Sequence, residues 1–292
     1  EITTGDWSSD VCSSDLRVPF IVTKRGTEEL TYAQTRRAGL RTPTRGVRTA
    51  ATAKSWLDLV QAVALTLPTG AVFSHTTAAR IHGLPTPPNT HDDVHVTVPK
   101  RGSRNAVTWH QRDVGDCSEL VKGLHVTNAN RTWLDLGACI EMPQLVAVTD
   151  VMLRRGLLQI SDLVVPVGTR GARRLRQAAE LADPGSRSVR ETLLRVKLHL
   201  NGLPAPEINS DIIEDGVWLG TGDLVWREYR LVIEYDGIHH DKPRQRHQDA
   251  QTRNAYAEHG WICIVLTSGQ FEHLDDTIGQ IVRVLRQRGW QA

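Results

Sequence analysis

GDLVWREYRLVIEYDGIHH, residues Gly222–His240, is the stretch that decides the fold of this chain. Two apolar runs, Leu224–Trp226 and Leu231–Ile233, stand on either side of a short polar segment. Short apolar runs interrupted by a turn are typical of a β-hairpin. We therefore predict two antiparallel strands, Trp218–Trp226 and Leu231–Tyr235.

The register of this hairpin determines where its charged side chains lie. A turn centred on residues 228–229 places Val225 opposite Val232 and Asp223 opposite Glu234. Directly opposed Cβ atoms lie about 4.5–5.5 Å apart, a distance at which like charges destabilise the pair. A slip of one residue would move Asp223 to the other face of the sheet.

Carboxylates on one face of a strand pair call for a compensating cation. Because side chains alternate along a strand, Asp223, Glu234 and Asp236 are predicted to project from the same face. Oxygen-rich groups of this kind suit Mg²⁺ or Mn²⁺. The sequence therefore predicts that Asp223 and Glu234 bind a divalent metal ion.

The segments around the hairpin predict a sheet covered by helices. The sequence DPGS at Asp183–Ser186 breaks the chain and predicts a domain boundary, so that this domain spans residues 183–292. The expected element order is αβββαβα. The other elements are a helix at Ser188–Asn201, a strand at Ile208–Ile213, a helix at Arg244–His259, a strand at Trp261–Leu266 and a helix at Phe271–Arg288.

The segment Asp183–Phe271 resembles a domain related to the very-short-patch-repair (Vsr) endonucleases, within the PD-(D/E)XK restriction-endonuclease-like superfamily. The likeness is carried by SVRETLLR at Ser188–Arg195, GDLVW at Gly222–Trp226, LVIEYDGIHH at Leu231–His240 and the run Arg244–Trp261. Each motif is weak alone, and the combination is specific. The resemblance covers about a third of the chain. It implies an α/β (α+β) fold with a restriction-endonuclease-like αβββαβ core.

The resemblance also implies a catalytic site. Asp223 and Glu234 take the two acidic metal-ligand positions, and Glu191 takes the acidic position on the first helix. The activity that these positions imply is metal-assisted hydrolysis of a DNA phosphodiester.

One position departs from the superfamily pattern. Asp236 stands where the superfamily often has a lysine that orients or activates the attacking water. His239, His240 or Lys242 could replace that lysine, or a second metal ion could do so; otherwise the domain is weakly active or inactive. Lys242 and Arg253 could also offset charge on the phosphate.

Ordinary structural roles compete with these assignments. Ser188 and Glu191 have the spacing of a capping box at a helix start. Asp236 before a glycine is also typical of a turn. Asp249 and Arg253 stand four residues apart, and a surface pair on a helix is the favoured interpretation for them.

Residues 69–182 resemble the N-terminal region of actinobacterial proteins related to the AbiEi antitoxin. The matching pieces are FSHTTAARIHGLP at Phe73–Pro85 and GLHVTNANRTWLDLG at Gly123–Gly137. We expect a mostly helical region with short strands at His95–Val98 and Val107–His110. Four histidines have no metal-ligand spacing and are interpreted as structural or surface residues, namely His75, His82, His95 and His110.

Basic residues concentrate at Arg17–Lys54, which holds nine of them against Glu28 and Glu29. This excess favours a polyanion such as DNA, although a solvated arm has the same composition. Residues 17–68 predict a small winged-helix or helix-turn-helix module. Its expected elements are helices at Thr31–Leu40 and Ser55–Leu67 and a strand at Gly46–Arg48. The arginines predicted to contact DNA are Arg36, Arg37, Arg41 and Arg45.

The first 16 residues, EITTGDWSSDVCSSDL, match a translated sequencing adapter, and we expect them to be disordered and dispensable. The whole chain has 33 acidic residues, and four of them lie in this segment. Without the segment, 29 acidic residues stand against 35 basic ones, which gives a net charge of +6. The remaining cysteines, Cys117, Cys139 and Cys263, form no CxxC pair and favour a reducing cytoplasm. We expect no transmembrane segment, since no apolar run is long enough.

Three classes of function are compatible with these patterns. The carboxylate face favours a Mg²⁺- or Mn²⁺-dependent DNA endonuclease acting in DNA repair or in defence against phages or mobile elements. The missing lysine favours a DNA-binding antitoxin-type transcriptional regulator with a catalytically inactive nuclease fold. No positive feature favours a protein-interaction module.

Overall fold

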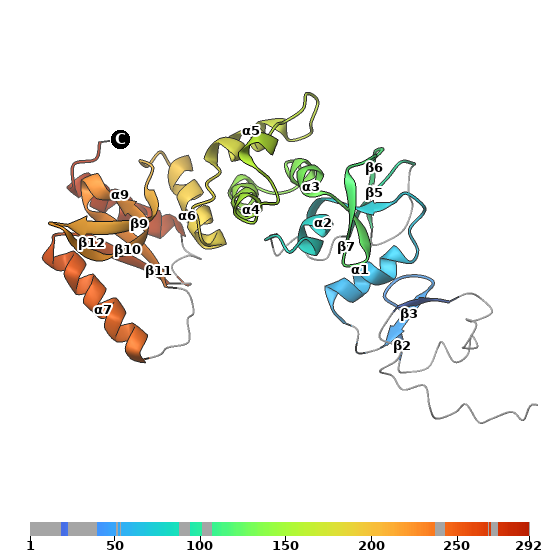
Figure 1. Ribbon diagram of the computed structural model, residues 1–292, viewed down its shortest axis with the longest axis horizontal. Coiled ribbons are helices and arrows are strands. Elements are labelled where there is room, and N and C mark those ends of the chain that lie inside the picture. Colours follow the sequence, from blue (N-terminus) through green and yellow to red (C-terminus); the bar gives the residue numbers. More distant parts are fainter. Residues whose placement is uncertain are drawn as a thin grey trace, which may run out of the picture. The chain divides into compact units, whose positions relative to one another are not determined.

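The computed structural model of the protein describes residues 19–22, 40–50, 52, 54–87, 94–100, 107–236, 243–267, 269 and 274–291. The side chains of residues 236 and 243–248 are outside this description. The chain forms two compact units, Glu1–Asp135 and Leu136–Ala292 (Figure 1). The adapter-like residues 1–16 and almost all of the helix expected at residues 31–40 lie outside the described residues.

A small antiparallel sheet in the first unit has the strand order β1-β3-β2. Its strands are β1 (Phe20–Ile21), β2 (Leu40–Arg41) and β3 (Val47–Ala50). Helix α1 (Trp56–Ala64) follows and begins at Ser55, whose side chain and backbone form a reciprocal capping box with Asp58. The sheet and α1 are the described parts of the module predicted over residues 17–68.

A larger sheet in the first unit has the order β6-β5-β4-β8-β7. Its strands are β4 (Val72–Phe73), β5 (His95–Val98), β6 (Thr108–Gln111), β7 (Ser118–Val121) and β8 (Leu124–Thr127). Helix α2 (His75–Ile81) contacts strands β5 and β8 of this sheet, and α3 (Ala129–Leu136) follows β8 along the chain. Only β5 and β6 were predicted, so this region contains more strand than the mostly helical expectation.

The second unit is built on a four-stranded sheet of order β12-β11-β10-β9. Strand β10 runs antiparallel to both β9 and β11, and β12 runs parallel to β11. From α6 to α9 the elements follow the predicted order αβββαβα. They are α6 (Val189–Leu200), β9 (Glu207–Glu214), β10 (Val217–Trp226), β11 (Leu231–Asp236), α7 (Pro243–Glu258), β12 (Ile262–Thr267) and α9 (Leu274–Gln287).

Two helices precede this order in the second unit. Helix α4 (Met142–Arg154) packs against α6, and α5 (Ala172–Leu181) packs against α4. Both helices lie within residues 69–182, the region that the sequence predicts to be mostly helical. In the structure they belong to the same compact unit as the sheet.

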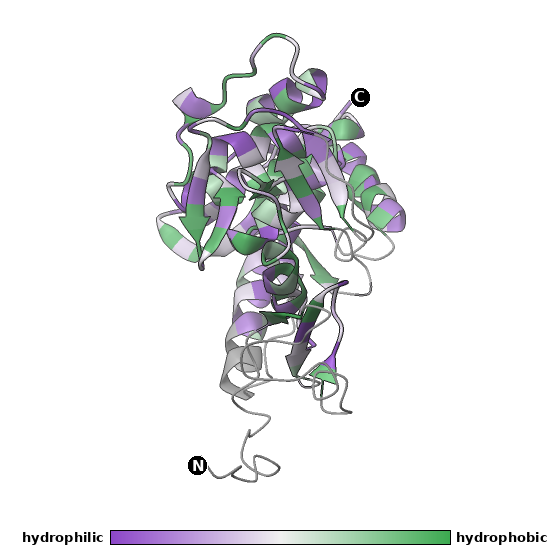
Figure 2. Ribbon diagram, turned by 90° about the vertical axis from the view of Figure 1, so that its right-hand side faces the viewer, coloured by the Kyte–Doolittle hydropathy of each residue, from purple (hydrophilic) through white to green (hydrophobic). Residues whose placement is uncertain are grey.

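Apolar residues cover both faces of this sheet. One core contains Leu198 of α6, Ile233 of β11 and Ile281 of α9, and the other contains Val225, Val232 and Tyr256. Figure 2 shows hydrophobic and hydrophilic residues interleaved along both the strands and the helices. Among the described residues, none of the helices has the length and hydropathy of a transmembrane span.

The hairpin register agrees with the prediction. Val225 pairs with Val232, and the neighbouring pair towards the open end is Leu224 with Ile233. The turn is a short 3-10 helix over Arg227–Tyr229, centred where the sequence places it. Extending this register by one residue sets Asp223 opposite Glu234.

Candidate functional site

Asp223 lies at the open end of the β10–β11 hairpin. Leu224 and Ile233 form the last pair of the antiparallel ladder there. Just beyond that pair, the backbone N–H of Tyr235 donates to Oδ2 of Asp223 at 2.7 Å. The Asp223 carboxylate therefore takes the place of a backbone acceptor, and this contact fixes its orientation.

The charge of Asp223 is poorly compensated. Burial and, to a smaller extent, the nearby Glu191 carboxylate raise the pKa of this carboxyl from 3.8 to about 6. Arg187 acts in the opposite direction, but it offsets only part of these effects. Asp223 is therefore a desolvated carboxylate beside a second acid.

Glu234 extends the acidic group onto β11. Burial raises the pKa of Glu234, and the charges of Asp223 and Asp249 add to this effect. Arg253 and the Tyr256 hydroxyl lower it. Helix α7 therefore brings Asp249 and Arg253 close to Glu234, although a surface pair was the favoured interpretation for them.

The close approach of α7 depends on a glycine in β10. A Cβ atom at Gly220 would lie 2.5 Å from Oη of Tyr256 and 2.8 Å from Cγ2 of Thr252. Both distances are shorter than real Cβ contacts, so a larger residue at this position would displace these side chains or α7. The glycine thereby helps to set the distance between α7 and the acidic group.

Glu191 is buried at the start of α6, with 7% of its surface exposed. Its Oε2 accepts from the backbone N–H of Arg187 at 3.0 Å and from Nδ2 of Asn209 at 2.9 Å. Its own N–H donates to Oγ of Ser188 at 3.1 Å. One half of the predicted capping box is thus present, while the carboxylate binds the residue before the N-cap and also faces Asp223.

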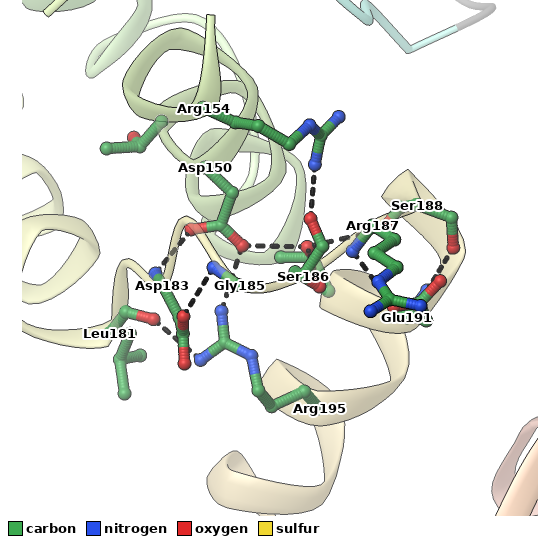
Figure 3. A network of polar contacts seen from close by, with 12 residues as sticks. Asp150, Arg154, Leu181, Asp183, Gly185, Ser186, Arg187, Ser188, Glu191 and Arg195 are labelled. Atoms are coloured by element: carbon green, nitrogen blue, oxygen red, sulfur yellow. Dashed lines mark hydrogen bonds and ion pairs between the residues drawn. The ribbon is translucent and has the colours of Figure 1, made fainter. Parts of the chain in front are cut away.

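A buried polar network holds the segment that leads into α6 (Figure 3). Asp150 on α4 accepts from the backbone N–H of Asp183 at 2.6 Å, from Oγ1 of Thr192 at 2.7 Å and from Nη2 of Arg195 at 3.0 Å. Oγ1 of Thr192 also lies 2.9 Å from Oγ of Ser186. These contacts fix residues 183–188, and with them the position of Glu191.

The structure brings Glu191, Asp223 and Glu234 together from α6, β10 and β11. Arg41 lies in β2 and the exposed Arg45 lies just before β3, both in the first unit. The other predicted site residues lie outside the described residues, namely Arg36, Arg37, His239, Lys242 and the side chain of Asp236.

A different group was missed by sequence reasoning. Among the described residues, His75, His95 and His110 are the one set of three potential ligands whose ligand atoms lie within 4.8 Å of one another. Burial lowers the pKa of His75 from 6.5 to about 2, with smaller effects from His110 and His95. From the sequence, these histidines are interpreted as structural or surface residues, and the structure brings the three of them close together. Their separation along the chain gives no ligand spacing.

Comparisons with known proteins give two relatives from Mycobacterium tuberculosis. Uncharacterized protein Rv2248 of strain ATCC 25618 / H37Rv and uncharacterized protein MT2308 of strain CDC 1551 / Oshkosh are each 28% identical to this chain over 201 residues. The match covers 66% of this chain and 73% of each relative. No protein-family model and no solved structure matches. Neither relative's name states an activity, so these likenesses do not assign one.

The raised pKa of Asp223 predicts a pH-dependent effect of its removal. In metal-free buffer, Asp223→Asn should raise the melting temperature above about pH 6 and leave it unchanged below about pH 4. The folded-state pKa lies above the ordinary value of 3.8, so protonation favours the folded state. That stabilisation is fully present below the unfolded pKa and is lost as pH rises through about 6.

Melting curves of both proteins in EDTA between pH 4 and pH 8 measure this difference. The matched control is Asp276→Asn, at an exposed position on α9, whose effect should not vary with pH in this way. A difference between Asp223→Asn and the unmodified chain that stays constant across the range would contradict the prediction.

Proposed function

We propose that the second unit is a metal-dependent DNA endonuclease that hydrolyses phosphodiester bonds. The observation that carries this proposal is the Asp223 carboxylate, desolvated and next to both Glu191 and Glu234. The αβββαβ order supports it, since the likeness to Vsr-type domains implies the same order and assigns acidic positions to these residues. We further propose that this core has the restriction-endonuclease-like fold.

The acidic group fits a hard divalent cation. Asp223 and Glu234 offer oxygen donors, which Mg²⁺ and Mn²⁺ prefer. Burial, together with the neighbouring acids, raises the pKa values of both carboxyls, and Arg187 and Arg253 offset only part of this effect. Asp223 and Glu234 would therefore hold the ion, which when bound supplies a Lewis acid for the phosphate and a source of nucleophilic water.

The residues around the carboxylates have separate tasks in this proposal. The Tyr235 N–H orients Asp223 through its hydrogen bond to Oδ2. Asn209 and the Arg187 N–H hold Glu191 in place, so its charge stays directed at the site. Arg253 is exposed on α7 near Glu234 and would attract a DNA phosphate. In the first unit, Arg41 and Arg45 would add phosphate contacts that are independent of base sequence.

Two features favour a second candidate function. Among the described residues, the oxygens of Glu191, Asp223 and Glu234 do not converge within 4.8 Å as a set of three ligands. Asp236 also stands where related nucleases often have the lysine. A DNA-binding regulator of antitoxin type, with an inactive nuclease fold, would tolerate both features.

Nicking of supercoiled plasmid DNA by the full chain separates the two functions. The endonuclease proposal predicts nicked or linear plasmid in Mg²⁺ or Mn²⁺ and none in EDTA. Duplex binding measured in parallel should weaken steeply with salt, because each neutralised phosphate releases counterions. Salt-sensitive binding without cleavage in either metal would overturn the endonuclease proposal and leave the regulator.

A further inference from the structure

Three histidines from separate segments meet on one side of the larger sheet in the first unit. His75 is the first residue of α2, His95 is the first residue of β5, and His110 lies in β6. The parallel register pairs Thr97 with His110 and His95 with Thr108. Because residues two apart on a strand share a face, His95 and His110 become diagonal neighbours.

The imidazole rings are close and nearly parallel. Nδ1 of His95 lies 2.9 Å from Nε2 of His110. The ring of His75 stacks on that of His110 with centroids 3.6 Å apart and an interplanar angle of 17°. One ligand nitrogen from each ring can be chosen so that all three lie within 4.8 Å of one another. Two nitrogens bound to one Zn²⁺ at its usual bond length and tetrahedral angle lie about 3.3 Å apart. The nitrogens are thus already close to this spacing, and the stacked rings must turn so that their lone pairs point to one ion.

Polar groups behind His75 match the outer shell of a metal-binding histidine. Nδ1 of His75 lies 2.9 Å from Oγ of Ser74, which in turn accepts from Oγ1 of Thr97 at 2.8 Å. Oδ2 of the buried Asp135 lies 3.9 Å from the same Nδ1. Metal-binding histidines usually present their second nitrogen to such a partner, which fixes the ring and its tautomer. With Nδ1 held, Nε2 is the nitrogen of His75 that remains for a metal ion.

The surrounding charges limit which ion would bind. Oδ1 of Asp135 accepts from Arg112 at 3.1 Å and from Nε of Arg131 at 3.0 Å. Both arginines therefore pair with Oδ1 of Asp135, whereas Oδ2 is the oxygen nearer to His75. The three rings offer nitrogen donors, whereas hard cations prefer oxygen donors. Imidazole nitrogen suits borderline ions such as Zn²⁺.

The backbone of His75 has an unusual conformation. His75 has φ of 54°, in the left-handed region that few non-glycine residues adopt. Such a conformation persists only where the surroundings hold it, and it is enriched at functional sites. It directs the first side chain of α2 towards His110.

We propose that His75, His95 and His110 bind one Zn²⁺ ion in a three-nitrogen site of the first unit, with a fourth coordination position left for water or another ligand. This site is distinct in donor chemistry from the acidic group of the second unit. It does not depend on the endonuclease proposal.

Zinc titration of the full chain tests this site. The protein is purified without a polyhistidine tag, stripped with EDTA, and carries Asp223→Asn so that the acidic group does not compete. Isothermal titration with Zn²⁺ should give one ion per chain, and the melting temperature should rise with Zn²⁺ concentration. Absence of Zn²⁺ binding to this chain would overturn the proposal.

Single substitutions locate the ligands. His95→Gln and His110→Gln should each weaken Zn²⁺ binding by at least about 100-fold, since even outer-shell changes cost 10–100-fold. The matched control, His125→Gln, changes an exposed histidine of β8 in the same unit and should bind Zn²⁺ like the parent. Unchanged binding in both ligand variants, or equal loss in the control, would overturn the assignment.

Cobalt substitution gives a measurement that does not depend on whether the variants fold. Co²⁺ added to the stripped parent chain should produce the visible absorption of a four- or five-coordinate ion, and one equivalent of Zn²⁺ should remove it. The weak spectrum of octahedral Co²⁺ would contradict a three-histidine site.

Discussion

Asp150→Ala is expected to lower the free energy of unfolding by about 3–5 kcal/mol. Asp150 is 1% exposed and pairs with Arg195, whose side chain is 12% exposed. Its removal leaves the Arg195 guanidinium without its anion and takes an acceptor from the Thr192 hydroxyl. An uncompensated buried charge costs far more than the pair contributes when intact.

Urea denaturation of the full chain, followed by circular dichroism, measures this loss in the transition of the second unit. The matched control is Asp275→Ala, which removes the 91%-exposed partner of Lys197 and should cost less than about 1 kcal/mol. In an Arg195→Ala background, Asp150→Ala should cost much less, because no buried cation is left behind. Equal losses for Asp150→Ala and Asp275→Ala would refute the argument.

The Asp150 pair also explains how α4 serves the candidate site. Burial raises the pKa of Asp150, so its hydrogen bonds and Arg195 do not fully offset desolvation of the carboxylate. The pair therefore contributes more to position than to net stability. It ties α4 to Asp183 and Thr192, on either side of the segment that carries Arg187. Loss of Asp150 should thus also disturb Glu191.

Local patterns explain which parts of the second unit could be predicted. Two apolar runs joined by a short polar turn determine the pairing of Val225 with Val232, because the length of the turn fixes the register of the hairpin. Helix α6 was predicted as residues 188–201 and spans 189–200, since Ser188 caps its start and Gly202 follows its end. Such signals lie within a few residues of the element that they define.

Contacts between distant segments could not be predicted in this way. Strand β4 has two residues, too few to show an alternating pattern. The interaction of Asp150 with Arg195 joins positions 45 apart, and nothing in either local sequence indicates the partner. His95 and His110 meet only because β5 and β6 pair in parallel, which the sequence does not reveal.

Asp223→Asn and Glu234→Gln are each expected to reduce metal-dependent plasmid nicking by more than about 100-fold, since even outer-shell changes at metal sites cost 10–100-fold. Both substitutions keep the size of the side chain and remove one negative charge. Asn at position 223 retains an oxygen that can accept from the Tyr235 N–H, so the hairpin end should keep its geometry. The loss should therefore reflect metal binding and not unfolding.

Nicking rates at several Mg²⁺ and Mn²⁺ concentrations, together with melting temperatures with and without metal, distinguish these causes. A protein that binds metal only when folded gains stability with metal concentration, and both variants should lose that gain. Asp276→Asn and Glu258→Gln remove exposed carboxylates of α9 and α7 and should nick like the unmodified chain.

Glu191→Gln separates the structural role of this residue from its charge. Gln keeps an oxygen that can accept from the Arg187 N–H or from Asn209, which now hold Oε2 of Glu191. If Glu191 only anchors the start of α6, the variant should nick at the normal rate. If its charge helps to hold the ion beside Asp223, nicking should fall while the metal-free melting temperature stays the same or rises, because one source of repulsion at Asp223 is gone. Full nicking activity in Asp223→Asn would show that the acidic group is not the cleavage site.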